Sequence, residues 1–356
     1  MRIVITGASG NLGTALLRAL EPGCEIVGVA RRTPGREAEP YSRAKWQPLD
    51  VGEPGAARRL AEVFAGADAV VHLAWAISPA WDSPPMWRTN DHGTRHVLEA
   101  VAKAGVGHLV CASSVAAYSP GPRDQKVAED WPRGGIEASA YSRGKAGLET
   151  MLDGFSSAHA EVAVARIRPC AVVQRTAAGE FARWTLGPLV PQRMIGGRLL
   201  PVPLWAGLRA QAVHADDVAE AIRLVLGRRA RGAFNIAAED VLDAAALGRL
   251  LGGRRVPAAK RVVRTVVRAG WRAGLQPLHP GWLELADRAA LVDTAHAKSK
   301  LGWQPRHSSA EAIQELVAGL RGHDRGQSAP LAPPQPGFLD RARALTRGRP
   351  ARQSQD

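Results

Sequence analysis

Thr6-Gly-Ala-Ser-Gly-Asn-Leu-Gly13 directly follows the apolar run Arg2-Ile-Val-Ile5, and a helical pattern continues from Leu12 to Leu20. In such a strand–turn–helix unit, the first glycine permits a tight turn, the second lets the backbone approach a pyrophosphate, and the third allows close helix packing. The helix N-terminus adds unpaired N–H groups and the positive end of the helix dipole. We therefore predict a dinucleotide-phosphate site, rather than an ordinary glycine-rich turn, formed by Gly7, Gly10, Asn11, Leu12 and Gly13.

Strand and helix patterns alternate through the first half of the chain. This alternation predicts the α/β class with a doubly wound parallel sheet. The expected strands are Glu25–Ala30, Ala69–Ala74, His108–Ser113 and Val162–Ile167, and the expected helices include Trp87–Ala104 and Ala140–Phe155.

The alternation breaks after Pro169 and resumes in part with the expected elements Gln211–His214, Asp216–Leu226, Ala233–Ala237 and Ala310–Leu320. We expect residues 1–170, completed by about 211–237, to form a nucleotide-binding domain. Residues 171–210 and 238–324 are expected to form a smaller, interleaved C-terminal α/β portion that binds substrate. Residues 325–356, rich in proline and arginine, are expected to form a disordered basic tail.

Composition excludes several other classes of protein. No run of about 18 apolar residues occurs, so no membrane span is expected. The first strand begins at the start of the chain, which leaves no room for a signal peptide and predicts a cytoplasmic protein. Cys24, Cys111 and Cys170 lie in apolar strands, and their spacing predicts neither disulfides nor a metal site.

The net charge of +14 raises the question of nucleic-acid binding. Most of the 47 basic residues are arginines spread through the whole chain, and no DNA- or RNA-binding motif accompanies them. We therefore expect no nucleic-acid partner. One segment, Arg254 to Arg272, has seven basic residues and no acid. Within it, Ala258–Ala273 has the pattern of a basic amphipathic helix, for which we favour a solvated basic side over docking on an anionic membrane.

Tyr141 and Lys145 lie four residues apart at the start of a helical pattern, and therefore on one helix face. A free phenol titrates at about 10, but a nearby ammonium group and an oxidised nicotinamide ring would both favour the phenolate. Proton transfer by Tyr141 would then be efficient near neutral pH. The same spacing also occurs by accident in many helices. The prediction that Tyr141 and Lys145 form a catalytic pair therefore depends on the residues around them.

Two further features surround this pair in the sequence. Ser113-Ser114 ends the strand before the tyrosine helix, where a serine hydroxyl can hold a substrate oxygen. Asn90 lies within an amphipathic stretch, either as a locally bonded helix residue or as part of a proton relay behind Lys145.

With these residues the chain resembles the extended short-chain dehydrogenases/reductases of the NAD(P)-dependent epimerase/dehydratase family, which have a Rossmann fold. The matching motifs fall in order over about residues 1–320: Thr6–Gly13, Asp50-Val51, His72–Ala76, Asn90, Ser113-Ser114, Tyr141/Lys145, Arg168-Pro169, Val213–Asp217 and Leu301–Trp303. The resemblance implies that Tyr141 is the acid–base, Lys145 holds the ribose, and Ser114 orients the substrate. It also implies that cofactor contacts come from Asp50, Val51, Leu73, Ala74 and, less directly, Asn90.

The second strand is followed by Arg31 and Arg32, and no acid occurs before Glu37. NAD sites usually place Asp or Glu here to bind the ribose 2′-OH, whereas an arginine accommodates a 2′-phosphate. A guanidinium can pair with that phosphate through two hydrogen bonds. We therefore favour NADP, with NAD as the alternative.

Three departures from the family pattern bear on the substrate. Ser113-Ser114-Val115 replaces the Thr-Asp-Glu of 4,6-dehydratases, and Ala171 and Ala210 replace an Asn and an Arg that nucleotide-sugar members often carry; Arg209 is one residue away. The first departure disfavours a 4,6-dehydratase, and the two alanines disfavour a diphosphate-bearing substrate. A lipophilic carbonyl or hydroxyl compound is expected instead, near a cleft mouth to which we assign Trp75, Trp81, Trp87, Trp184 and Trp205, about half of them as ordinary packing residues.

The sequence thus predicts an NAD(P)-dependent oxidoreductase that transfers hydride between a nicotinamide and a small carbonyl or hydroxyl substrate. The catalytic residues are predicted to be Ser114, Tyr141 and Lys145, with no metal. The alternatives are a nucleotide-sugar epimerase with tightly bound cofactor and a non-catalytic NADP-sensing protein. A homodimer is left open.

Overall fold

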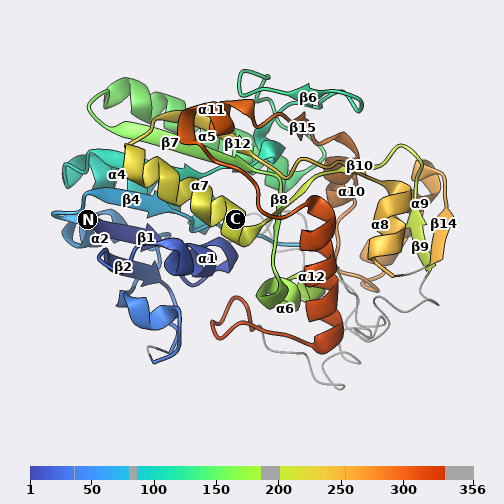
Figure 1. The fold of residues 1–356 in the computed structure, drawn as a ribbon, viewed down its shortest axis with the longest axis horizontal. Coiled ribbons are helices and arrows are strands. Elements are labelled where there is room, and N and C mark those ends of the chain that lie inside the picture. Colours follow the sequence, from blue (N-terminus) through green and yellow to red (C-terminus); the bar gives the residue numbers. More distant parts are fainter. Residues whose placement is uncertain (36, 80–85, 186–200, 253, 333–356) are drawn as a thin grey trace, which may run out of the picture.

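A parallel sheet forms the centre of the computed structural model, which describes residues 1–35, 37–79, 86–185, 201–252 and 254–332. Its seven strands lie in the order β3-β2-β1-β4-β5-β7-β12 (Figure 1). Every neighbouring pair is parallel. The strands are β1 (Arg2–Thr6), β2 (Glu25–Ala30), β3 (Ala44–Pro48), β4 (Ala69–His72), β5 (His108–Ala112), β7 (Ala163–Pro169) and β12 (Gly232–Ile236).

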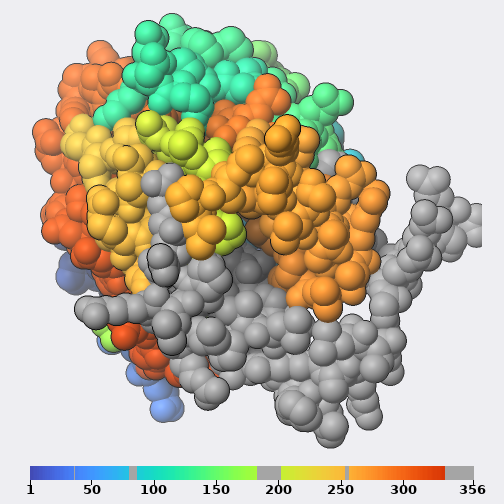
Figure 2. Space-filling model, turned by 90° about the vertical axis from the view of Figure 1, so that its right-hand side faces the viewer, coloured from blue at the N-terminus to red at the C-terminus, as the bar shows by residue number. Residues whose placement is uncertain are grey.

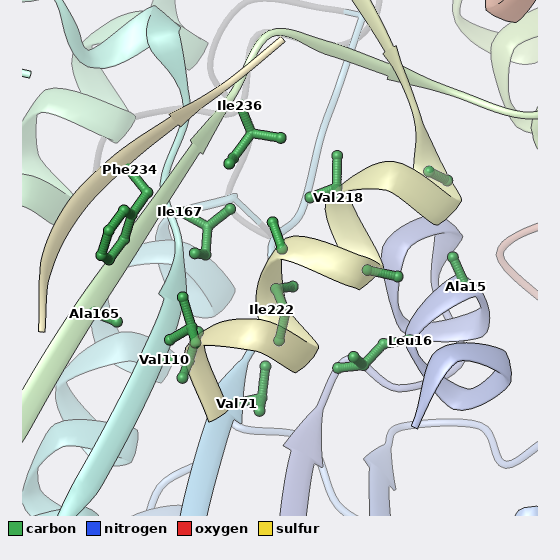
Figure 3. Close-up of a cluster of buried hydrophobic side chains, with 14 of the residues drawn as sticks. Ala15, Leu16, Val71, Val110, Ala165, Ile167, Val218, Ile222, Phe234 and Ile236 are labelled. Carbon is green, nitrogen blue, oxygen red and sulfur yellow. The ribbon is translucent and has the colours of Figure 1, made fainter. Parts of the chain in front are cut away.

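Helices cover both faces of this sheet. Helices α1 (Asn11–Ala19) and α7 (Ala215–Arg228) pack on one face, and the other is covered by α2 (Ala56–Phe64), α4 (Gly93–Lys103) and α5 (Ala140–Ala158). In Figure 3, Leu16 of α1 and Ile222 of α7 point toward the sheet residues Val71 and Val110. The predicted α/β class and doubly wound parallel sheet are confirmed.

The sequence patterns missed β3 and joined two helical segments into one. Only Trp46 is buried in β3, because β3 is an edge strand, so no apolar run marks it. The predicted helix Trp87–Ala104 begins with a π-helical turn, η2 (Trp87–His92), before α4. Single π turns are rare and often found at functional sites.

The remaining elements gather mostly beyond one end of the sheet (Figure 1). Figure 2 looks onto this side, where the orange residues of α9 and α10 form much of the described surface. The elements are η1 (Tyr41–Arg43), η3 (Val115–Ala117), β6 (Lys126–Val127), β8 (Ala171–Val173), η4 (Arg175–Ala177), α6 (Ala178–Thr185), β9 (Pro201–Leu204), β10 (Arg209–Ala210), β11 (Ala212–His214), β13 (Leu242–Asp243), α8 (Ala244–Leu250), β14 (Arg254–Pro257), α9 (Lys260–Arg272), α10 (Gly281–Arg288), β15 (Leu291–Val292), α11 (Ala295–Leu301) and α12 (Ser309–Gly322).

Two motifs that carried the family resemblance meet at Asp217. This buried carboxylate, at the start of α7, accepts hydrogen bonds from the backbone N–H groups of Arg306 and His307, both at 3.1 Å. The indole of Trp303 donates to the carbonyl of Asp217 at 2.8 Å. The Val213–Asp217 and Leu301–Trp303 motifs therefore join the C-terminal part of the chain to the sheet domain.

The expected disordered tail begins within a packed segment. Ser328 is buried and donates a hydrogen bond to the carbonyl of Ser9 at 2.6 Å, and Leu331 is fully buried. Ser328 thus lies against the glycine-rich turn, and the burial of Leu331 also holds this first part of the expected tail. Residues 333–356 lie outside the described part of the chain.

Helix α9 divides its valines between two environments. Val263 is buried, whereas Val262 and Val266 are 52% and 64% exposed. The valines therefore do not form one packed face. Within the described residues no helix is long and apolar enough to span a membrane, and no group of three or more His, Cys, Asp or Glu side chains is placed to hold a metal ion.

Candidate active site

The glycine-rich turn lies where the strand order reverses, between β1 and β4. Gly7 has a φ of +73°, and a Cβ on it would lie 2.6 Å from the backbone nitrogen of Ala74. A Cβ on Gly13 would lie 2.5 Å from the carbonyl oxygens of Gly7 and Ala8. Only glycine fits these two positions. Ligands of doubly wound sheets bind at this reversal point. The assignment of the turn to a dinucleotide phosphate stays a prediction.

The other predicted cofactor residues surround this cradle. Leu73 and Ala74 follow β4, and the N–H of Leu73 bonds the carbonyl of Thr6 at 2.9 Å. Asn11, at the start of α1, donates to the carbonyl of Val172 at 3.1 Å. Gly10 precedes the helix in extended conformation, and Leu12 is half-buried beside it.

The far end of the predicted cofactor site lies beyond β2 and β3. Arg31 and Arg32 are exposed at the carboxyl end of β2, and no carboxylate in the described part of the chain pairs with either. Asp50 is buried after β3, accepts a hydrogen bond from the N–H of Gly52 at 3.0 Å, and pairs with Arg88 at 3.0 Å. Val51 is buried next to it.

The start of helix α5 is fixed to the strand end that carries Ser114. Ser139 caps the helix by accepting a hydrogen bond from the N–H of Ser142 at 3.3 Å. The hydroxyl of Ser142 donates to the carbonyl of Ala116 at 2.6 Å and accepts from the N–H of Ile136 at 2.7 Å. These local contacts place the first turn of α5, which contains Tyr141, beside Ser114.

A side-chain hydrogen bond joins Tyr141 to Ser114. Burial raises the pKa of Tyr141, and the hydrogen bond from Ser114 opposes that effect. The predicted lowering by Lys145 is not seen in the protein alone, since the Lys145 ammonium lies 6.0 Å from the centre of the Tyr141 ring. It stays a prediction for the complex with an oxidised nicotinamide.

Lys145 lies one helical turn after Tyr141 and is almost fully buried. Its ammonium donates to the carbonyl of Ala112, the last residue of β5, at 2.9 Å. The same nitrogen lies 3.7 Å from the centre of the Trp75 ring. Burial lowers the pKa of Lys145 to about 7, although the thiol of Cys111 and the carboxylate of Glu149 partly oppose this effect.

Asn90 does not contact Lys145 through its side chain. Its amide accepts from the N–H of Ala76 at 2.7 Å and donates to the carbonyl of Ala76 at 2.9 Å. This paired contact comes from the π-helical turn and holds the backbone that follows β4. The sequence suggested that Asn90 forms a local helix bond or takes part in a proton relay. In the structure its side-chain amide instead forms two hydrogen bonds with the backbone of Ala76, an arrangement that we call the Asn90 clamp.

Sequence reasoning missed Trp282, which covers the phenol from the C-terminal portion. The rings of Trp282 and Tyr141 stack with centres 5.3 Å apart, and the Trp282 indole donates to the carbonyl of Ser78 at 3.3 Å. A pocket beside them is lined by Ser78, Met86, Ser139, Ala140, Tyr141, His279, Gly281 and Trp282. No local pattern marks Trp282, because its contact partner belongs to another half of the chain.

The five tryptophans predicted near the cleft mouth lie in different surroundings. Trp75 packs beside Lys145, whereas Trp205 is buried and donates to Asp287 at 2.6 Å within the C-terminal portion. Trp87 is 58% exposed. Trp81 and the side chain of Trp184 lie outside the described residues.

A buried ion network stands behind the site. Arg168 of β7 binds both carboxylate oxygens of Glu149 on α5, at 2.8 and 2.9 Å, and Arg166 binds the same carboxylate at 3.1 Å. Burial alone would raise the pKa of Glu149, but the hydrogen bonds and charge of Arg168 lower it to about 2. Arg168 also donates to the phenol of Tyr118 at 2.8 Å, so this arginine joins α5, β7 and the segment after β5.

Comparison with known proteins places these residues in context. Residues 3–237 match the model described as "NAD dependent epimerase/dehydratase family". An uncharacterized protein of Mycobacterium tuberculosis is 29% identical over 90% of this chain, which spans 30% of that protein's length. The chain thus spans about a third of the first curated relatives it matches. A UDP-glucose 4-epimerase of Mycolicibacterium smegmatis is 27% identical over 90% of this chain and 99% of its own length.

Solved structures show the same fold at lower identity. A UDP-glucose-4-epimerase from Stenotrophomonas maltophila with bound NAD superposes with a TM-score of 0.66 and 20% identity, covering 91% of this chain and 98% of its own. The Thermus thermophilus UDP-glucose 4-epimerase complex with NAD gives the same TM-score at 21% identity, covering 90% and 99% of the two chains.

Proposed function

Because the chain belongs to the NAD-dependent epimerase/dehydratase family, we propose that it is an NAD(P)-dependent oxidoreductase acting on a carbonyl or hydroxyl substrate. One observation carries the proposal: Tyr141 and Ser114 are hydrogen-bonded at the carboxyl end of β5, two strands from the glycine cradle. A proton donor and an oxygen-binding hydroxyl thus stand beside a place for a dinucleotide.

The residues present fit a dinucleotide. The backbone at Gly7 and Gly13 is too close to its neighbours for any Cβ, and helix α1 begins at Asn11 without a side-chain cap. Such an uncapped helix N-terminus is suited to a pyrophosphate. A nicotinamide bound there would supply or accept a hydride. Tyr141 would give its proton to the substrate oxygen when the substrate is reduced, or take it when the substrate is oxidised, and Ser114 would hold that oxygen in place.

The proposal includes a preference for NADP. It is supported by the exposed guanidinium groups of Arg31 and Arg32 at the end of β2, which no carboxylate in the described part of the chain neutralises. A carboxylate at this position would repel a 2′-phosphate, whereas a guanidinium can pair with it.

Nucleotide-sugar epimerisation is the second candidate, favoured by the likeness to UDP-glucose 4-epimerases along nearly their whole length. The residues that would bind a diphosphate weigh against it. Ala171 is exposed on β8 without a polar group, and Arg209 bonds the carbonyls of Ala206 and Leu208. An epimerase would keep its cofactor bound and show no net consumption of NADPH.

The test is turnover by the purified chain with NADPH or NADH, against panels of carbonyl compounds and UDP-sugars. We expect NADPH oxidation with a lipophilic carbonyl compound. Tyr141→Phe should lower kcat by at least 100-fold and leave NADPH affinity within about twofold, because only the proton donor is removed. Unchanged turnover in this variant contradicts the assignment of Tyr141, and turnover of a UDP-sugar alone supports the epimerase.

A further inference from the structure

The face of Trp75 covers the ammonium group of Lys145 at a distance of 3.7 Å. We propose that Trp75 is a positioning residue that keeps Lys145 charged and fixed at the carboxyl end of β5. The proposal rests on the proposed function only for what Lys145 does to a ligand. The contact itself is a property of the protein alone.

Three contacts hold Trp75 in this position. Asn90 fixes the backbone of Ala76 on one side, and the N–H of Leu73 bonds the carbonyl of Thr6 on the other. Gly144 of α5 lies against the indole, since a Cβ at this position would lie 3.3 Å from Cζ2 of Trp75. The indole is therefore held between the segment after β4, which carries it, and Gly144 of helix α5.

A buried ammonium needs such a contact. Burial disfavours the charge of Lys145, and the surrounding groups compensate only in part. Those groups are the thiol of Cys111 on β5 and the carboxylate of Glu149 on α5. The imidazole of His72 on β4 also lies near the ammonium, but burial first, and then the charge of Lys145, lower its pKa to about 3, so it is neutral and adds no repulsion. The electron-rich face of an indole attracts a desolvated cation more strongly than an exposed one.

The same geometry limits what Lys145 offers to a ligand. An ammonium group has three N–H donors. One is used by the carbonyl of Ala112, and the side that faces Trp75 is closed to a hydroxyl. Lys145 therefore approaches a ribose or substrate hydroxyl from one direction only, which Trp75 sets.

The inference is tested by titrating the lysine side chains with ¹³Cε NMR, which needs no turnover. The chain has only seven lysines, and Lys145→Arg identifies the signal of Lys145 by its loss. We expect Trp75→Leu, which keeps an apolar side chain but removes the π face, to lower the pKa of Lys145 by about one unit, or tenfold in its protonation equilibrium. The matched Trp75→Phe should lower it less, because a phenyl ring keeps part of the attraction.

Gly144→Ala provides an independent variant if Trp75→Leu does not fold. The added methyl group pushes against the indole and should also lower the pKa of Lys145. The other six lysines should titrate as in the wild type. A pKa of Lys145 that is unchanged or raised in Trp75→Leu, or in Gly144→Ala, overturns the inference, since Trp75 would then only exclude water. If these shifts occur in a protein that turns over no substrate with NADPH or NADH, the proposed function fails and the inference stands.

Discussion

Two groups of arginines carry the same charge in opposite surroundings. Arg166 and Arg168 lie behind the site with 12% and 3% exposed side chains, and both bind the buried carboxylate of Glu149. Arg31 and Arg32 lie at the end of β2, exposed and without a carboxylate partner in the described part of the chain. The ion pairs of Arg166 and Arg168 stabilise the fold, whereas the guanidinium groups of Arg31 and Arg32 are accessible to an anionic ligand. An arginine-rich composition therefore does not show which arginines can bind a ligand; that depends on which of them already pair with carboxylates.

The largest expected effect comes from breaking the buried network. Glu149→Gln leaves the guanidinium of Arg168 buried without its counter-ion, which costs about 3–5 kcal/mol in the free energy of unfolding. Urea unfolding at pH 7 measures the loss. The control is Asp153→Asn, whose side chain is 46% exposed and should cost no more than about 1 kcal/mol. Equal losses in both variants contradict the special role of the buried carboxylate.

Acid should remove the same stabilisation gradually. The pKa of Glu149 is about 2 in the folded chain, below its ordinary value of 4.5, so its contribution is complete above pH 4.5 and is lost as the pH falls toward 2. The shift corresponds to about 3 kcal/mol. The difference in unfolding free energy between wild type and Glu149→Gln should therefore shrink between pH 4.5 and 2. A difference that is constant over this range shows that Glu149 is not the titrating group.

Substitution of the exposed Arg31 and Arg32 should have the opposite pattern to substitution of Glu149. It should weaken ligand binding and leave the free energy of unfolding nearly unchanged. Arg31→Ala and Arg32→Ala together should raise the Kd for NADPH at least tenfold, because hydrogen bonds from a charged donor to the phosphate are lost. The Kd for NADH and the free energy of unfolding should change little, the latter by less than about 0.5 kcal/mol. Arg231→Ala, exposed before the amino end of β12, is the matched control. Equal losses for NADPH and NADH would show that these arginines do not select the phosphate.

Much of the site could be predicted because its parts are local in the sequence. The turn from Gly7 to Gly13 has its strand and helix directly on either side, and the spacing of Tyr141 and Lys145 fixes them on one helix face. Ser114 was placed by the end of a buried strand. Edge strand β3 could not be found in this way, because only one of its side chains is buried.

Contacts between distant segments could not be predicted by the same means. Trp282 over Tyr141, and the clamp from Asn90 to Ala76, depend on how the C-terminal portion and the π-helical turn pack. Among the tryptophans expected near the cleft, Trp205 proved to be a packing residue, since its indole bonds Asp287 within its own portion of the chain.

The sequence by itself determined the glycine-rich turn, the doubly wound sheet and the placing of Tyr141 and Lys145 on one helix face, because these follow from glycine conformations and from the periods of strands and helices. Only the tertiary structure decided the electrostatic state of those residues. The pKa of Lys145 depends on the depth of its burial, and the pKa of Glu149 on helix α5 depends on Arg168 of strand β7. A charged group is stabilised by what lies within a few ångströms of it, and that neighbourhood forms only when distant segments pack together.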